Sequence, residues 1–168
     1  MHLKRLFLSE RRQEKQAAKD LYDVVLRGAL APQIYLNHLA EDTFDGRFEQ
    51  VALHGALVMM ALRDRKSQKL SEALLKQIFD GFDYAYRETG VGDSSISRKV
   101  RTLGERFYGL ARGLEKALRS ETNEALAAFV SRNALADNSK DLLVSYLRSA
   151  RERLSHVKDL STVDWPHV

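Results

Sequence analysis

Apolar residues recur with helical spacing along almost the whole chain, and short segments rich in turn-forming residues separate these stretches. No alternating polar and apolar run of useful length is present, so the pattern predicts no strand. Capping residues, glycines and prolines mark the ends of the predicted helices. These helices span residues 9–30, 32–40, 47–64, 68–89, 93–119, 120–135 and 138–157. We therefore expect an all-α protein: a single-domain bundle of about six or seven helices over residues 1–168, with an irregular tail at 158–168.

The predicted helix at 47–64 is apolar on every side. At about 100° per residue, the segment VALHGALVMMAL (residues 51–62) places apolar side chains almost completely around the axis. This run is shorter than the roughly 20 residues that cross a bilayer, so we interpret the helix as the buried centre of the bundle. The N-terminal segment MHLKRLFLSERRQEKQ has too short an apolar run for a secretory signal and is interpreted as the start of a helix.

The predicted helix at 93–119 accounts for the net positive charge of the protein. Residues 98–119 hold seven basic and two acidic side chains, a net charge of +5, whereas the whole chain has +4. Apolar side chains share one face, and a basic face lies on the opposite side within about 60°. The residues of this basic face are Arg98, Arg101, Arg112, Lys116 and Arg119, with the acidic Glu105 among them. A solvated helix face is the commoner meaning of such a pattern, and a surface for RNA phosphates or an acidic partner is the alternative.

Three glycines interrupt the same helix, at Gly104, Gly109 and Gly113. Each glycine costs about 1 kcal/mol relative to alanine inside a helix. We therefore expect a neighbouring element to approach the backbone of this helix closely at these positions.

Few residues indicate chemistry. The chain has no cysteine, which excludes disulfides, thiolate metal sites and a cysteine nucleophile. No two of its histidines have the spacing of a helical metal pair, and we interpret His54, inside the predicted central helix, as a hydrogen-bonded core residue. The carboxylates of residues 42–49 lack the alternate spacing of a calcium loop. Helix capping and a local Arg–carboxylate pair explain this turn better.

Residues 90–95 precede a helix but lack a nucleotide-binding motif, so we interpret them as a structural turn. The sequence thus predicts a protein that is not an enzyme, with no catalytic, metal-binding or cofactor-binding residue. A hydrolytic or metal enzyme that uses the carboxylate-rich turn and His54 is the least favoured alternative.

Several short motifs, taken together, resemble the ubiquinol–cytochrome c chaperone family. The resemblance covers roughly residues 15–120 and is most specific in two segments, DTxDGRF and RExGVGD. The motifs are Leu21-Tyr22, Ile34-Tyr35, Asp42 to Phe48, Leu53-His54, Arg87 to Asp93 and Phe107-Tyr108-Gly109. The chain is similar to short, bacterial-type members. The resemblance implies a non-enzymatic factor that assists the assembly of respiratory complex III and handles newly made cytochrome b.

The resemblance also implies candidate partner-binding residues at the matching motif positions. These are Asp42, Thr43, Asp45, Gly46, Arg47, Phe48, Arg87, Glu88, Gly90, Val91, Gly92 and Asp93. Because the client is apolar, we expect an exposed apolar patch as well. Its candidate residues are Phe44, Phe48, Tyr84 and Tyr86.

Mitochondrial members of the family work beside the ribosome with a small partner subunit. The resemblance therefore implies the ribosome and a small partner subunit as candidate partners of this protein. We expect a cytoplasmic protein without a cofactor or small-molecule substrate, and peripheral contact with the inner face of the cytoplasmic membrane is a candidate. The alternative function is RNA or ribosome binding through the basic face of residues 98–119.

Overall fold

The computed structural model of the chain describes residues 2–88, 93–133, 135–136 and 139–168. Helices account for most of this part, and no strand occurs in it, which confirms the all-α prediction. The elements are α1 (His2–Ala29), α2 (Pro32–Leu36), α3 (Phe44–Asp64), α4 (Gln68–Glu88), α5 (Asp93–Leu118), α6 (Asn123–Arg132), α7 (Lys140–His156) and the short 3-10 helix η1 (Leu160–Thr162).

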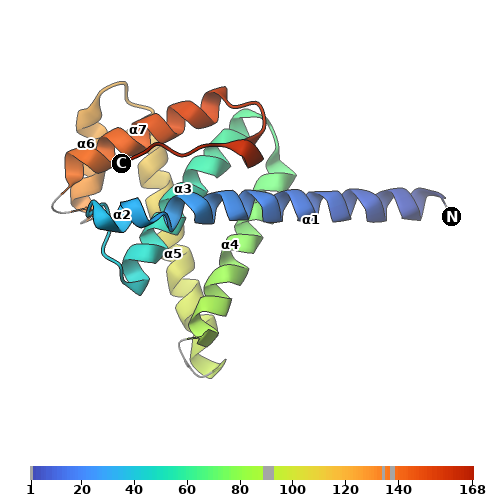
Figure 1. Cartoon of the computed structure of the whole chain (residues 1–168). Helices are drawn as coiled ribbons and strands as arrows, with labels where there is room; N and C mark the ends of the chain where they lie inside the picture. The colour runs from blue at the N-terminus through green and yellow to red at the C-terminus, as the bar shows by residue number, and fades with distance from the viewer. Residues whose placement is uncertain (1, 89–92, 134, 137–138) are drawn as a thin grey trace.

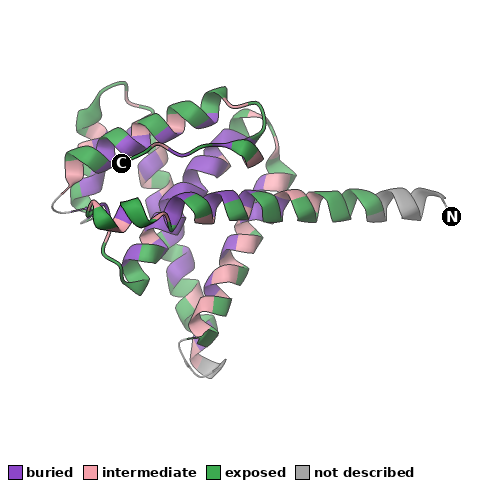
Figure 2. Ribbon diagram, viewed as in Figure 1, coloured by how far each residue is buried: buried purple, intermediate pink, exposed green. Residues whose placement is uncertain are grey.

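Helix α3 forms the centre of the bundle, as predicted. It contacts α1, α4, α5 and α7, and fourteen of its 21 residues are buried. Figure 2 shows the buried surface concentrated where these helices meet. An all-round apolar helix gains most from this position, because burial removes its whole apolar circumference from water.

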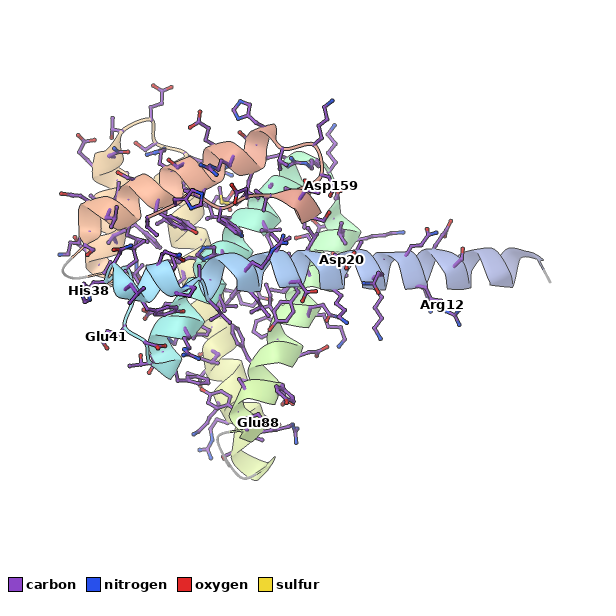
Figure 3. The ribbon with its side chains drawn as sticks, viewed as in Figure 1. Arg12, Asp20, His38, Glu41, Glu88 and Asp159 are labelled. Atoms are coloured by element: carbon purple, nitrogen blue, oxygen red, sulfur yellow. The ribbon has the colours of Figure 1, made fainter. Side chains whose placement is uncertain are left out.

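The remaining helices surround α3 in a simple arrangement (Figure 1). Helix α1 crosses α3 and α4, α4 lies against α5, and α6 connects α5 to α7 through contacts with both. The first turns of α1 extend past the other helices, and Arg12 lies on this extension (Figure 3). No helix in the described part of the chain has the length and apolar content needed to cross a membrane.

Several helix ends differ from the prediction: α3 begins three residues earlier, α6 is three residues shorter at each end, and the largest differences are in α1 and α2. Helix α1 begins at His2 instead of Ser9, which confirms that the N-terminal segment is helical. Helix α2 ends at Leu36 instead of continuing to residue 40. The reason is His38, whose φ of 57° lies in the left-handed region that a right-handed helix does not allow.

The glycines of α5 have different surroundings. A β-carbon on Gly113 would lie 2.8 Å from the ring of Phe129, so this glycine does allow a close approach, by a side chain of α6. At Gly104 the nearest atom, in Phe79, would be at an ordinary 3.4 Å. At Gly109 no atom of the described residues outside the adjoining helix backbone lies within 4 Å of that position, and the predicted close approach within the chain is wrong there.

Candidate functional site

The acidic turn at residues 41–49 is held by short-range polar contacts. The hydroxyl of Thr43 accepts a hydrogen bond from the backbone N–H of Gly46 at 3.1 Å and so caps α3. Arg47 donates to Asp42 at 2.6 Å, and this hydrogen bond lowers the pKa of the Asp42 carboxyl. Helix capping and a local ion pair are therefore confirmed for this turn. The conformation of this turn requires glycine at position 46, because a β-carbon there would collide with the backbone carbonyl of Glu41.

Arg106 of α5 connects the acidic turn to the bundle. Its guanidinium donates to Asp45 at 2.6 Å and to Glu49 at 3.3 Å, and it lies 4.7 Å from the ring centre of Phe48. Burial raises the pKa of Glu49, although the nearby charge of Arg106 acts in the opposite direction. Phe48 itself is only 3% exposed, so it packs in the core and does not contribute to an exposed apolar patch.

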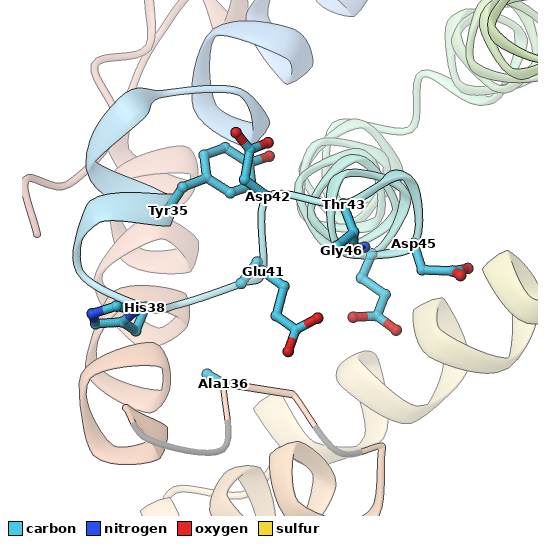
Figure 4. A pocket seen from close by; sticks show the side chains of 10 residues that line it. Tyr35, His38, Glu41, Asp42, Thr43, Asp45, Gly46 and Ala136 are labelled. Atoms are coloured by element: carbon cyan, nitrogen blue, oxygen red, sulfur yellow. Dashed lines mark hydrogen bonds between the residues drawn. The ribbon is translucent and has the colours of Figure 1, made fainter. Parts of the chain in front are cut away.

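A pocket of about 510 Å³ opens beside this turn (Figure 4). It lies where the α2–α3 connection faces Ala136 on the segment between α6 and α7. Its lining residues are Tyr35, His38, Ala40, Glu41, Asp42, Thr43, Asp45, Gly46, Glu49 and Ala136. Four of these carry carboxylates, yet no group of three or more His, Asp or Glu in the described chain is arranged to hold a metal ion. We name this site the acidic pocket.

The second family motif lies at the end of α4. Arg87 pairs with Asp83 at 2.7 Å, and Glu88 is exposed at the end of the helix (Figure 3). Asp93 begins α5. The predicted candidates Gly90, Val91 and Gly92 lie outside the described residues.

An aromatic contact brings the two motifs together. The ring of Phe44, at the start of α3, packs on Tyr86 near the end of α4 with centres 4.8 Å apart. The ammonium of Lys99, on α5, lies 5.4 Å from the centre of the Tyr86 ring. The starts of α3 and α5 and the end of α4 therefore form one surface, which carries the acidic turn.

Three aromatic side chains are exposed on α3, α4 and α5. Tyr84 is 65% exposed and Phe44 is 36% exposed, as the sequence led us to expect, whereas Tyr86 is only partly exposed. Tyr108 is 46% exposed and was missed as an apolar surface residue. Its position beside the basic stripe on the helical wheel would have indicated its exposure.

The predicted basic face of α5 is exposed along its whole length. Arg119 pairs with Glu115 at 2.7 Å. The other four cations, Arg98, Arg101, Arg112 and Lys116, form no ion pair with any residue that the structure describes. Ion pairs within the described part of the chain therefore do not neutralise the positive charges of these four side chains.

His54 lies in the core as predicted. Its Nδ1 donates to the carbonyl of Gln50 at 2.7 Å, because a carbonyl can only accept. Its Nε2 therefore accepts from the hydroxyl of Tyr146 at 2.6 Å. The imidazole is fully buried and lies edge-on to Trp165, and burial lowers its pKa to about 4. Both ring nitrogens are occupied by protein groups, which is the arrangement of a structural histidine.

Comparison with known proteins identifies the family of this chain. The sequence pattern of the family described as ubiquinol-cytochrome C chaperone matches residues 37–162, which include the acidic turn and α3 to α7. The chain belongs to this chaperone family. No curated protein sequence matches it.

A solved structure shares the fold of this chaperone family member. The crystal structure of the Cbp3 homolog from Brucella abortus superimposes with a TM-score of 0.82 at 23% sequence identity. The alignment covers 99% of this chain and 97% of that chain. The overall helical fold is therefore shared with that protein.

Proposed function

We propose that this protein is a non-enzymatic chaperone for the assembly of ubiquinol–cytochrome c reductase, respiratory complex III, and that its client is newly made cytochrome b. The observation that carries this proposal is the family match over residues 37–162. The burial of His54 supports a role without catalysis, since both of its ring nitrogens form hydrogen bonds to protein groups. The proposed place of action is the cytoplasm, in peripheral contact with the inner face of the cytoplasmic membrane.

The surface around Phe44 and Tyr86 is the proposed client contact. It combines exposed aromatic rings with the carboxylates of the acidic pocket. The segments of a membrane protein are apolar and are flanked by Lys and Arg on the cytoplasmic side. Aromatic side chains suit the apolar part of such a client, and the carboxylates suit its cationic flanks.

Complementation of a deletion strain tests this function. The strain lacking the gene should contain less assembled cytochrome b, measured as the haem b absorbance of washed membranes. Wild type should restore it, and Phe44→Glu should not, because a charge would replace the exposed ring. Leu142→Glu is the matched control, since Leu142 is similarly exposed (39%) but lies on α7. Normal cytochrome b in the deletion strain would refute the proposal.

Additional partners follow from the same proposal. We propose contact with the ribosome and with a small partner subunit. Purification of the protein from its native host, followed by identification of bound proteins, tests both. Recovery of neither ribosomal proteins nor a stoichiometric small protein would contradict this part of the proposal without affecting the client.

RNA binding by the basic face is the second candidate function. The specific observation is that Arg101, Arg112 and Lys116 are exposed and have no ion-pair partner in the described chain. Each phosphate contact contributes about one unit to the slope of log affinity against log salt. Reversing these three charges should therefore weaken RNA binding and flatten the slope by about three units. An unchanged slope would leave the face as a solvated surface.

A further inference from the structure

Gly109 is a helix-interior glycine that nothing in the described chain explains. It lies in the middle of α5 on the exposed side. No atom lies within 4 Å of the position that its β-carbon would occupy. A glycine here weakens the helix, and its usual compensation is close approach of another backbone. Gly113, one turn later, instead makes room for the side chain of Phe129.

A partly apolar groove lies on the same side of α5. Its volume is about 240 Å³, and it lies between α3, α4 and α5. Its apolar lining comes from Ala56, Met59 and Met60 of α3 and from Tyr108 and Ala111 of α5. Gln68 and Ser71 of α4 and the ion pair of Arg63 with Glu115, at 2.9 Å, form its polar part. Met59 is only partly buried, unlike most residues of α3. Methionine side chains adapt to varied apolar partners, as at other protein-binding surfaces.

One unpaired cation of the basic face, Arg112, lines this groove. On the helical wheel, Tyr108, Arg112 and Gly109 follow one another within about 100°. Arg101 and Lys116 extend the same side of α5 over about 22 Å of helix axis. A partly apolar groove, the exposed backbone at Gly109 and three cations that form no ion pair in the described chain thus lie on one side of α5, with Glu105 among the cations.

We propose that this side of α5 docks an amphipathic acidic helix of another protein, with the closest approach of the two backbones at Gly109. The apolar side chains of the partner helix enter the Met59–Tyr108 groove. Its carboxylates pair with Arg101, Arg112 and Lys116. An acidic helix uses all three features, whereas RNA would use the cations alone and would leave the methionine-lined groove unfilled. The surface shares no residue with the proposed client contact at Phe44 and Tyr86, and the inference does not depend on that function.

A peptide pair tests the docking surface with the purified full-length protein. The probe is a fluorescein-labelled helical peptide of about 20 residues, long enough to span Arg101 to Lys116, with Leu on one face and Glu on the other. The control peptide has the same Leu face and Lys in place of Glu. Fluorescence anisotropy should show that the acidic peptide binds at least about tenfold tighter than its basic counterpart.

Substitution at Gly109 separates docking from folding. Gly109→Gln adds a side chain into open space, and glutamine favours a helix more than glycine does. The variant should keep or raise the melting temperature and lose about tenfold in affinity for the acidic peptide, the effect expected when the centre of an interface is blocked. The matched control is Ser149→Gln, which adds the same side chain at an exposed position of α7. It should bind as wild type does.

Reversing two charges of the basic face provides an independent test of the docking surface. The double variant Arg112→Glu/Lys116→Glu should reject the acidic peptide and gain affinity for the basic one. Equal binding of the two peptides by wild type, or full binding by Gly109→Gln, would overturn the proposal. An RNA hairpin that binds wild type and Gly109→Gln equally, and more tightly than the acidic peptide, would overturn it in favour of RNA.

Discussion

Protonation of His54 should make the stability of this protein depend on pH. In the folded protein, burial lowers the pKa of His54 from 6.5 to about 4, and the hydrogen bond to Gln50 opposes this shift only in part. In the unfolded chain the imidazole titrates at its ordinary value near 6.5. Between these two values the unfolded state binds more protons than the folded state. Stability is therefore complete above pH 6.5, falls as the pH drops toward 4, and loses nothing further from this group below 4.

The size of this effect follows from the two pKa values. Their separation, from about 4 to 6.5, corresponds to about 3 kcal/mol if the whole range is crossed. By pH 5, about 2 kcal/mol should already be lost relative to pH 7.5. This is a large fraction of the stability of a typical domain.

Urea unfolding of wild type and His54→Gln isolates the effect. Glutamine is neutral at every pH used, and the other titrating groups are common to both proteins, so their contributions cancel in the difference. His54→Gln should be less stable than wild type at pH 7.5, and the gap should narrow by about 2 kcal/mol at pH 5. The His54 ring signals in NMR should not titrate between pH 7.5 and 5. A constant gap, or an imidazole that titrates near pH 6.5, would refute the reasoning.

Four further substitutions test the packing, each by thermal unfolding followed by circular dichroism. Thr43→Ala removes the cap of α3 and should cost about 1 kcal/mol; no change would mean that the cap is not formed in solution. Gly109→Ala should stabilise by about 1 kcal/mol because its surroundings are open, whereas Gly113→Ala should destabilise because the methyl group would lie 2.8 Å from Phe129. Equal effects would contradict the packing of α5. Gly28→Ala places a methyl group against the rings of His54 and Trp165 and should lower the free energy of unfolding by about 1–3 kcal/mol. The tryptophan fluorescence should change as well. A stable variant with unchanged fluorescence would show that the segment around Trp165 is loosely packed.

The fold was predictable because its strongest signals are local. The all-round apolar pattern of residues 51–62 predicted the central position of α3, and its burial confirms this. The opposed faces of α5 were equally clear, since Leu103, Phe107 and Leu114 are buried while the basic face is exposed. The interpretation of His54 as a core residue followed from its apolar neighbours in sequence.

The surface was predictable only in part, because its contacts join residues far apart in sequence. Arg106 binds Asp45 across 61 positions, and no helical pattern indicates which carboxylate it reaches. Phe48 is adjacent to the exposed turn in sequence, yet it points into the core and packs on Phe82. The open side of Gly109 depends on where α6 crosses α5, which is decided by tertiary packing.

The segment from Leu160 to Val168 has a consequence for synthesis of the protein. The indole of Trp165 donates to the carbonyl of Val24 at 2.9 Å, and Asn37 donates to the carbonyl of Val168 at 3.0 Å. These contacts close the core between α1 and α3 with residues that leave the ribosome more than a hundred positions after α1. Until they emerge, the nascent chain exposes the apolar side of α1, so the unfinished chain is itself open to aggregation.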